Sequence, residues 1–181
     1  GSATSETGSS SQFFVTPTTD GGHVIGASFF SAPLTFSGSA IAVTNSGVNT
    51  QSDVFVAKYN SSGTLQWAKG FGGSAASETL GGFGLLSDGT VVAGAQGTSA
   101  STTFGSGEAN QTIFANLGST DFFVAAFNGN DGTLRWAKRA GGLSAEILSS
   151  LAVTPDNSIA ITGTFSAASA QFGIGEPGQV T

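Results

Sequence analysis

The sequence of 181 residues has no cysteine and no methionine, only one histidine, and only 9% charged residues. Without cysteine it forms no disulfides, no cysteine-zinc site and no thiol chemistry, and its redox compartment stays open. A single histidine excludes metal sites built from several histidines. No apolar run reaches about 18 residues, so we expect no insertion into a membrane. Because methionine is absent, we expect a processed product or a piece of a longer protein.

The charge balance excludes two classes of partner. Five Lys and Arg stand against eleven Asp and Glu, which gives a net charge of −6. A negative chain repels phosphate backbones and anionic lipid headgroups. We therefore expect neither nucleic acid nor a membrane surface as partner.

The residues that are abundant favour a folded all-β protein. Hydrophobic residues make up 39% of the chain, with 15 Phe and 28 Gly, enough apolar area to offset chain entropy. High glycine with little charge is typical of turn-rich β structure. The start of the chain differs, since residues 1–12 have the polar composition of a flexible leader or linker.

A long internal repeat is the main feature of the chain. The segment DVFVAKYNSSGTLQWAKGFGG, 53–73, returns as DFFVAAFNGNDGTLRWAKRAGG, 121–142, so Asp53 recurs as Asp121. Two further acidic sets keep this spacing: Asp20, Asp88 and Asp156, and Glu78 and Glu146. A period this long indicates a multi-strand unit that cannot bury its apolar face alone. We divide the chain into repeats at 13–79 and 80–147 and a partial repeat at 148–181.

Each unit reads as two hairpins. Residues 53–60 alternate between two faces, a turn follows at 61–63, and 64–69 alternate again, which predicts a hairpin. A second hairpin is predicted around Asp88, with strands near 83–86 and 90–94. Two hairpins make a four-stranded antiparallel meander, and no window has helical periodicity with caps.

Long polar links separate the hairpins, roughly at 31–52 and 98–120. Each carries a phenylalanine near a glycine, Phe36 and Phe104, with Phe172 at the matching place in the third copy. Structureless links of this length are uncommon in compact domains and are usually functional or assembly surfaces. We expect short strands here, packed along a sheet edge.

The repeated pattern D-x-F-V-A-K-Y-N-x-x-G-x-L-x-W-A-K-x-F-G-G, followed by an acidic residue and an Asp-Gly turn, resembles the bacterial beta-propeller repeat family known as SBBP. The resemblance covers about residues 13–175. It implies tandem four-stranded antiparallel blades of a β-propeller, export, and an extracellular or bacterial cell-surface role. It implies no reaction.

The chain holds about two and a half such blades, whereas a propeller typically closes with 4 to 8. An open sheet edge pairs readily with another strand. We therefore expect the blades to assemble with other chains, or with the rest of a longer protein, through their open edges.

The repeated aromatic residues have a packing interpretation. Trp67 and Trp136 occupy matching places, and a buried tryptophan contributes a large area and one N–H donor. We predict that they pack between blades together with Phe55 and Phe123. Exposed in a row, the two tryptophans would instead stack on sugar rings.

The polar candidates are mostly turn residues. Aspartate before a β-turn accepts hydrogen bonds from backbone N–H groups two residues on, which is our interpretation of Asp20, Asp88 and Asp156. Calcium is the alternative, with Asp131 and Asp156 as candidate ligands, but no loop matches D-x-[DN]-x-[DN]-G. We predict no metal or other cofactor, and an ordinary edge or core role for His23.

Glu78 and Glu146 leave two interpretations open. A carboxylate pair at one end of a propeller could serve a polysaccharide hydrolase or lyase. Catalytic residues are normally unique, however, and these are copied, which favours carboxylates that brace a repeated loop. The sequence thus predicts a non-enzymatic extracellular structural scaffold. The alternatives are a segment that binds carbohydrate or protein through loops 31–52 and 98–120, and an enzyme.

Overall fold

The structure, a computed structural model, describes residues 12–30, 33–47 and 50–173. Every regular element within these ranges is a β-strand, and the sheets are antiparallel, which confirms the predicted all-β class. No helix long and apolar enough to cross a membrane occurs in the described part of the chain. Residues 1–11 of the predicted leader and 174–181 of the third repeat lie outside the described residues.

The described residues form fifteen strands. In chain order they are β1 (Phe14–Pro17), β2 (His23–Phe29), β3 (Leu34–Thr35), β4 (Ala42–Val43), β5 (Asp53–Tyr59), β6 (Leu65–Phe71), β7 (Glu78–Leu85), β8 (Val91–Gly97), β9 (Ser101–Phe104), β10 (Thr112–Ala115), β11 (Asp121–Phe127), β12 (Leu134–Gly142), β13 (Glu146–Val153), β14 (Ile159–Phe165) and β15 (Ala170–Phe172).

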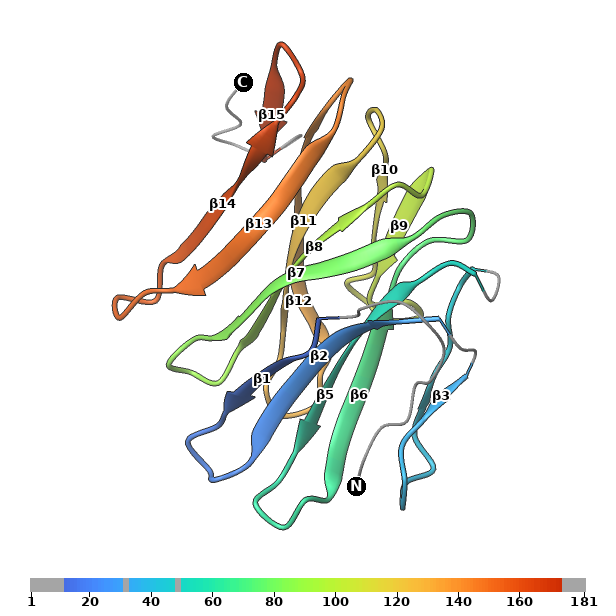
Figure 1. The fold of residues 1–181 in the computed structure, drawn as a ribbon. Helices are drawn as coiled ribbons and strands as arrows, with labels where there is room; N and C mark the ends of the chain where they lie inside the picture. The colour runs from blue at the N-terminus through green and yellow to red at the C-terminus, as the bar shows by residue number, and fades with distance from the viewer. Residues whose placement is uncertain (1–11, 31–32, 48–49, 174–181) are drawn as a thin grey trace.

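Three sheets follow one another along the chain and lie face against face (Figure 1). Sheet 1 has the order β1-β2-β5-β6, and sheet 2 has β7-β8-β11-β12 with β15 added beside β12. Sheet 3 consists of the hairpin β13-β14. Sheets 1 and 2 are therefore each built from two successive hairpins, as the repeat predicts.

The long links carry short strands. Within the described residues, β3 pairs with β4 in the first link and β9 with β10 in the second. Thr103 of β9 also exchanges backbone hydrogen bonds with Gly72, the residue that follows β6. Likewise, Ala170 of β15 pairs with Gly142 at the end of β12. β15 thus extends sheet 2, whereas β9 contacts the end of sheet 1 through a single isolated bridge.

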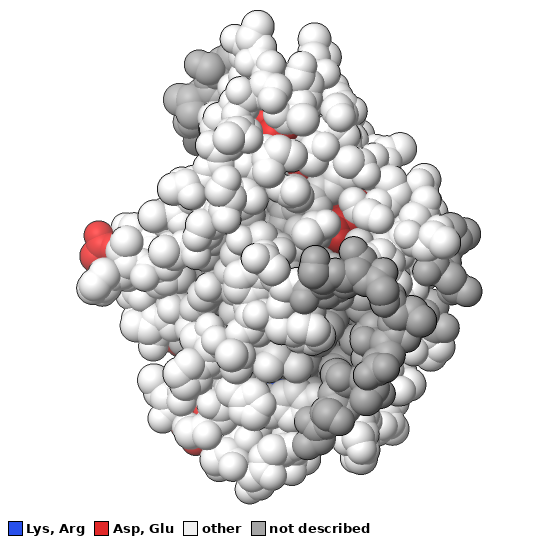
Figure 2. Space-filling view, in the orientation of Figure 1, with Lys and Arg blue, Asp and Glu red and all other residues white. Residues whose placement is uncertain are grey.

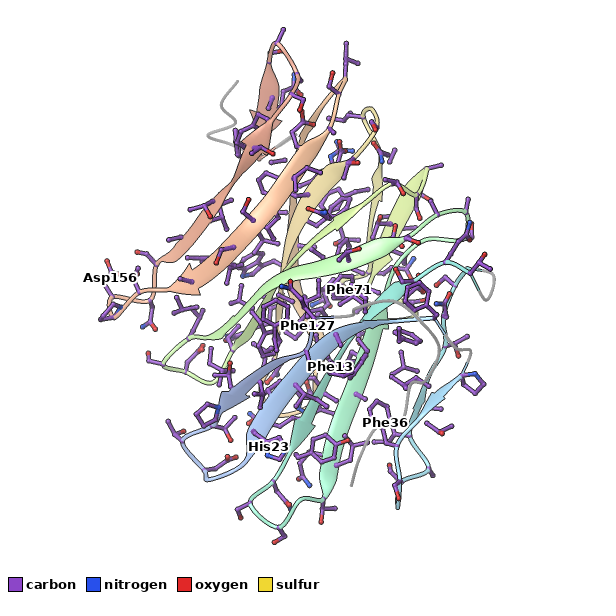
Figure 3. All side chains as sticks on the ribbon, in the orientation of Figure 1. Phe13, His23, Phe36, Phe71, Phe127 and Asp156 are labelled. Atoms are coloured by element: carbon purple, nitrogen blue, oxygen red, sulfur yellow. The ribbon has the colours of Figure 1, made fainter. Side chains whose placement is uncertain are left out.

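The largest core lies between sheets 1 and 2. Val54 and Val56 of β5 point into it, as the period of two in the sequence indicates. Phe71 stacks on Phe104 with ring centroids 4.8 Å apart and on Phe127 at 5.9 Å. Figure 3 shows Phe71 and Phe127 close together in the middle of the molecule.

Glycines let the sheets approach closely at both junctions. A Cβ on Gly26 of sheet 1 would lie 2.8 Å from Leu80 Cδ2 of sheet 2. At the next junction, a Cβ on Gly94 would lie 2.6 Å from Leu148 Cδ2. Gly26 and Gly94 are one repeat period apart, as are Leu80 and Leu148. The same contact between sheets is therefore built twice.

Candidate functional site

A pair of buried acidic residues lies at each junction between consecutive sheets. Asp53 begins β5 of sheet 1 and Glu78 begins β7 of sheet 2. Asp121 and Glu146 repeat this arrangement at the starts of β11 and β13. Their exposed fractions are 1% for Asp53 and 0% for the other three. Carboxyl groups this deeply buried need a compensating partner.

Backbone hydrogen bonds hold each glutamate against the preceding sheet. Glu78 N donates to Ser52 O at 2.7 Å, and Ser52 Oγ donates to Glu78 O at 2.8 Å. In the copy, Glu146 N donates to Thr120 O at 2.8 Å. The residue before each aspartate thus binds the matching glutamate, which brings the acids of two sheets to one place.

In the first pair, one oxygen of each carboxyl group is held by a backbone amide. Ser46 N donates to Asp53 Oδ2 at 2.5 Å, and Gly73 N donates to Glu78 Oε2 at 2.9 Å. Thr102 Oγ1 donates to Glu78 Oε1 over 3.4 Å. Asp53 Oδ1 is buried without a hydrogen-bond partner among the described residues.

Burial dominates the electrostatics of this pair. Burial, joined by the neighbouring negative charge of Asp53, raises the pKa of Glu78 to about 7 against the opposing effect of hydrogen bonds from Ser99, Gly73 and Thr102. Burial also raises the pKa of Asp53. The first pair therefore changes its charge near neutral pH.

The second pair has a cation near its aspartate but fewer hydrogen bonds to its carboxyl groups than the first. Asp121 Oδ2 accepts a hydrogen bond from Leu117 N at 3.0 Å and lies 4.0 Å from Arg139 Nε. Burial raises the pKa of Asp121, and the Arg139 charge opposes this. Arg139 also donates to Ala115 O. Both carboxyl oxygens of Glu146 are buried without a hydrogen-bond partner in the described residues.

The Gly-Gly sequences make room for the aspartates. A Cβ on Gly72 would overlap the carboxyl group of Asp53, and one on Gly141 would overlap that of Asp121. Only glycine fits at these two positions. The Gly-Gly sequences thus form one wall of each acidic pair.

The three repeated turn aspartates lie at the opposite ends of these strands. Each accepts a hydrogen bond from the backbone N–H two residues on: Gly22 N to Asp20 at 3.2 Å, Thr90 N to Asp88 at 2.9 Å and Ser158 N to Asp156 at 3.1 Å. The Thr18 hydroxyl and Lys58 lower the pKa of Asp20 to about 2. Asp88 and Asp156 also have lowered pKa values, chiefly through the hydroxyl groups of Thr90 and Thr154. This geometry is that of turn capping.

A pocket of about 600 Å³ opens among these turns. Its lining residues from all three sheets include Val24, Lys58, Leu85, Asn130, Val153 and Asn157. Lys58 does not project freely into it, since its Nζ lies 3.1 Å from Asp20 Oδ2 and donates to Gly129 O at 3.2 Å. The pocket combines apolar and polar walls, as small-molecule sites do.

The two tryptophans both contact the neighbouring sheet. Trp67 is 4% exposed and donates from Nε1 to Gly129 O of sheet 2 at 3.2 Å. Trp136 is partly buried and packs against a cluster that includes Val92 of its own sheet and Leu151 of sheet 3. Neither ring stands free on the surface.

The two phenylalanines named with the tryptophans, Phe55 and Phe123, lie beneath the short hairpins of the long links, β3-β4 and β9-β10. Phe55 packs edge-on against Phe36, with centroids 5.9 Å apart. Phe123 contacts Phe104 at 5.6 Å and Phe114 at 6.0 Å. The link phenylalanines thus anchor the hairpins β3-β4 and β9-β10 to the sheets; residues 31–32 and 48–49 of the first link are outside the described residues.

The remaining candidates occupy unremarkable places. His23 stacks on Tyr59 with centroids 5.2 Å apart. Asp131 accepts a hydrogen bond from Thr133 N at 2.9 Å in an exposed turn, and Asp156 lies at the tip of the β13-β14 hairpin, away from the other labelled residues (Figure 3). No group of three or more His, Cys, Asp or Glu suited to a metal ion gathers in the described part of the chain.

Two of the four buried acids, Asp53 and Asp121, were missed as site residues by the sequence analysis. The signal that could have found them is the shared spacing of aspartate, Gly-Gly and glutamate in both copies. No family model, curated protein or solved structure matches the chain.

Proposed function

We propose that the chain is a row of β-propeller-type blades that serves as a non-enzymatic structural scaffold outside the cell or on a bacterial surface. The observation that carries this proposal is the repeated junction. Each junction has a glycine that receives a leucine, a buried acidic pair and a link strand hydrogen-bonded to the end of the preceding sheet. A unit that is joined to its neighbour in the same way each time builds a regular rigid array. The extracellular location rests on the resemblance to the SBBP repeats.

The burial of the glutamates argues against a hydrolase or lyase. Glu78 and Glu146 are 0% exposed, and neither lines the pocket among the turns. A glycosidase needs both carboxyl groups at the scissile bond. We therefore expect no release of reducing ends from a panel of polysaccharides. Release that disappears in both Glu78→Gln and Glu146→Gln would overturn the non-enzymatic assignment.

The blade arrangement is tested by the curvature of the array. The chain has no cysteine, so pairs of spin labels can be introduced at Thr19, Ser87 and Pro155, which are matching turn positions of the three sheets. In a propeller, successive blades are rotated about one axis. We expect equal distances for the pairs 19–87 and 87–155, and a 19–155 distance clearly shorter than their sum. A 19–155 distance equal to that sum would show a straight stack and would contradict the propeller.

Self-association through open edges is part of this proposal. Phe13 and Val15, beside and on β1, are 60% and 69% exposed, and exposed apolar edges favour strand addition. Light scattering should detect a mass that rises with concentration. The variant Val15→Lys should reduce this rise. A wild-type chain that stays monomeric at all concentrations would contradict self-association.

The pocket among the turns supports a second candidate, binding of a neutral glycan or a protein segment. Its lining holds Lys58, which pairs with Asp20, together with Asp88, so polyanions find no basic patch in it. Figure 2 shows that one whole face of the molecule has few charged atoms. Titration with cello-, chito- and maltohexaose, followed by amide chemical shifts, tests this candidate. Shifts confined to the pocket, and lost in the pocket-filling variant Asn130→Trp, would support it, while an unchanged spectrum would remove these glycans as ligands.

A further inference from the structure

The first acidic pair lacks a positive charge that the second pair has. At the second junction, Arg139 Nε lies 4.0 Å from Asp121 Oδ2. At the first, the position that matches Arg139 in the repeat is Gly70, and no salt bridge to Asp53 or Glu78 is formed by the described residues. Two buried acids without a cation are costly, so something else must neutralise them.

We propose that Asp53 and Glu78 bind a divalent cation, Ca²⁺, between sheets 1 and 2. Calcium is a hard cation that takes carboxylate, hydroxyl and carbonyl oxygens. The oxygens gathered here are of these kinds: the two carboxyl groups and the hydroxyls of Ser99 and Thr102. All four residues are at most 1% exposed.

The hydrogen bonds leave oxygens free for such an ion. Backbone amides hold Asp53 Oδ2 and Glu78 Oε2, so each carboxyl group is oriented through one oxygen. The second oxygen of Asp53 has no hydrogen bond of ordinary geometry among the described residues, although Glu78 and Gly73 lie near enough to lower the pKa of Asp53. Glu78 Oε1 has only the 3.4 Å contact from Thr102. Ser99 Oγ lies near enough to Glu78 to lower its pKa, yet it is buried without a hydrogen bond of ordinary geometry. An oriented carboxyl group whose second oxygen has no partner is suited to ligation.

The two copies differ in the way this proposal requires. The hydroxyl-bearing residues Ser99 and Thr102 have Ala167 and Ala170 at the matching positions of the next repeat. The second copy therefore loses two oxygen donors where it gains the guanidinium of Arg139. One junction supplies its own cation, and the other supplies oxygens for a bound one.

A proton is the competing partner of the first pair. A carboxyl group must lose its proton to bind a metal ion, so a proton and the ion compete for this pair. The calcium site concerns one junction only and does not depend on whether the sheets close into a ring.

The test is a thermal unfolding and calorimetric titration of the full chain at pH 8, first in EDTA and then with calcium chloride. We expect one ion per chain and a rise in Tm of about 5 °C at calcium well above Kd. Glu78→Gln and the double variant Ser99→Ala with Thr102→Ala should lose this rise. The matched control Glu146→Gln, and Asp131→Asn combined with Asp156→Asn, should keep it.

Three outcomes would overturn the proposal. An unchanged Tm with no heat of binding in the wild-type chain would leave the proton as the partner of the pair. A rise that persists in Glu78→Gln but disappears in Glu146→Gln would place the ion at the second junction. A rise lost only with the Asp131 and Asp156 substitutions would place it in the exposed turns.

Discussion

The two junctions of this molecule share one design but differ in the groups that face their buried acids. Between sheets 1 and 2, Glu78 receives hydrogen bonds from Gly73 and Thr102. Between sheets 2 and 3, Arg139 faces Asp121, and no described residue donates to the carboxyl group of Glu146. The geometry of the junction is therefore the same in both copies, whereas the groups that contact the buried acids differ.

The largest effect is expected where the first junction has no space. A Cβ on Gly73 would overlap the carbonyl of Ser101 and the side chain of Ser99. Because backbone cannot move aside easily, Gly73→Ala should lower the free energy of unfolding by about 3 kcal/mol in urea titrations. Gly63→Ala is the control, because its Cβ would meet nothing within 4 Å. It should lower the free energy of unfolding by about 1 kcal/mol, through its positive φ alone. Equal losses at both positions would contradict a tightly packed junction.

The next effect is a pH dependence that belongs to the first junction. The pKa of Glu78 rises from 4.5 to about 7 on folding, so the folded state binds more protons between these values and stability falls as pH rises through them. In EDTA, the free energy of unfolding should drop by about 3 kcal/mol from pH 4.5 to pH 7.5. Urea titrations across this range should show the drop.

Two variants test whether Glu78 causes the drop in stability. Glu78→Gln should flatten it, because glutamine does not titrate. Asp20→Asn should leave it in place, since the lowered pKa of Asp20, about 2, makes its contribution fade only under more acidic conditions. A drop that survives in Glu78→Gln would mean that another group causes it.

A smaller effect is expected from the arginine at the second junction. Arg139→Gln removes the guanidinium near the buried Asp121 carboxyl group and should cost about 2 kcal/mol, measured by chemical unfolding. Arg135→Gln is the matched control, because its pair with Asp88 is about half exposed on both sides and exposed pairs contribute under about 1 kcal/mol. If the two substitutions cost the same, Arg139 has no special part in the junction.

Local sequence patterns predicted the strands, whereas the positions of the site residues relative to one another depend on how the sheets stack. Alternation along 53–60 and the turn at 61–63 predict β5 and β6, and the structure has both. Asp53 and Glu78 are separated in the chain by the whole of β6 and belong to different sheets. No periodicity within one strand brings them together, so their contact could not be derived from local sequence.

The replacement of Gly70 by Arg139 in the second copy could not be interpreted from the sequence either. Arg139 departs from its counterpart Gly70, and nothing in the strand pattern says which buried group it faces. That knowledge requires the register of β12 beside β11, where Arg139 pairs with Phe123.

The central claim is that Asp53 and Glu78 form one site across two sheets. A double-mutant cycle tests this claim most directly. The cycle combines Asp53→Asn and Glu78→Gln, measured as free energy of unfolding at pH 8 in EDTA. We expect a coupling of about 1 kcal/mol or more between the two substitutions, as neighbouring buried groups show. Losses that add to within about 0.5 kcal/mol would mean that the two acids act separately.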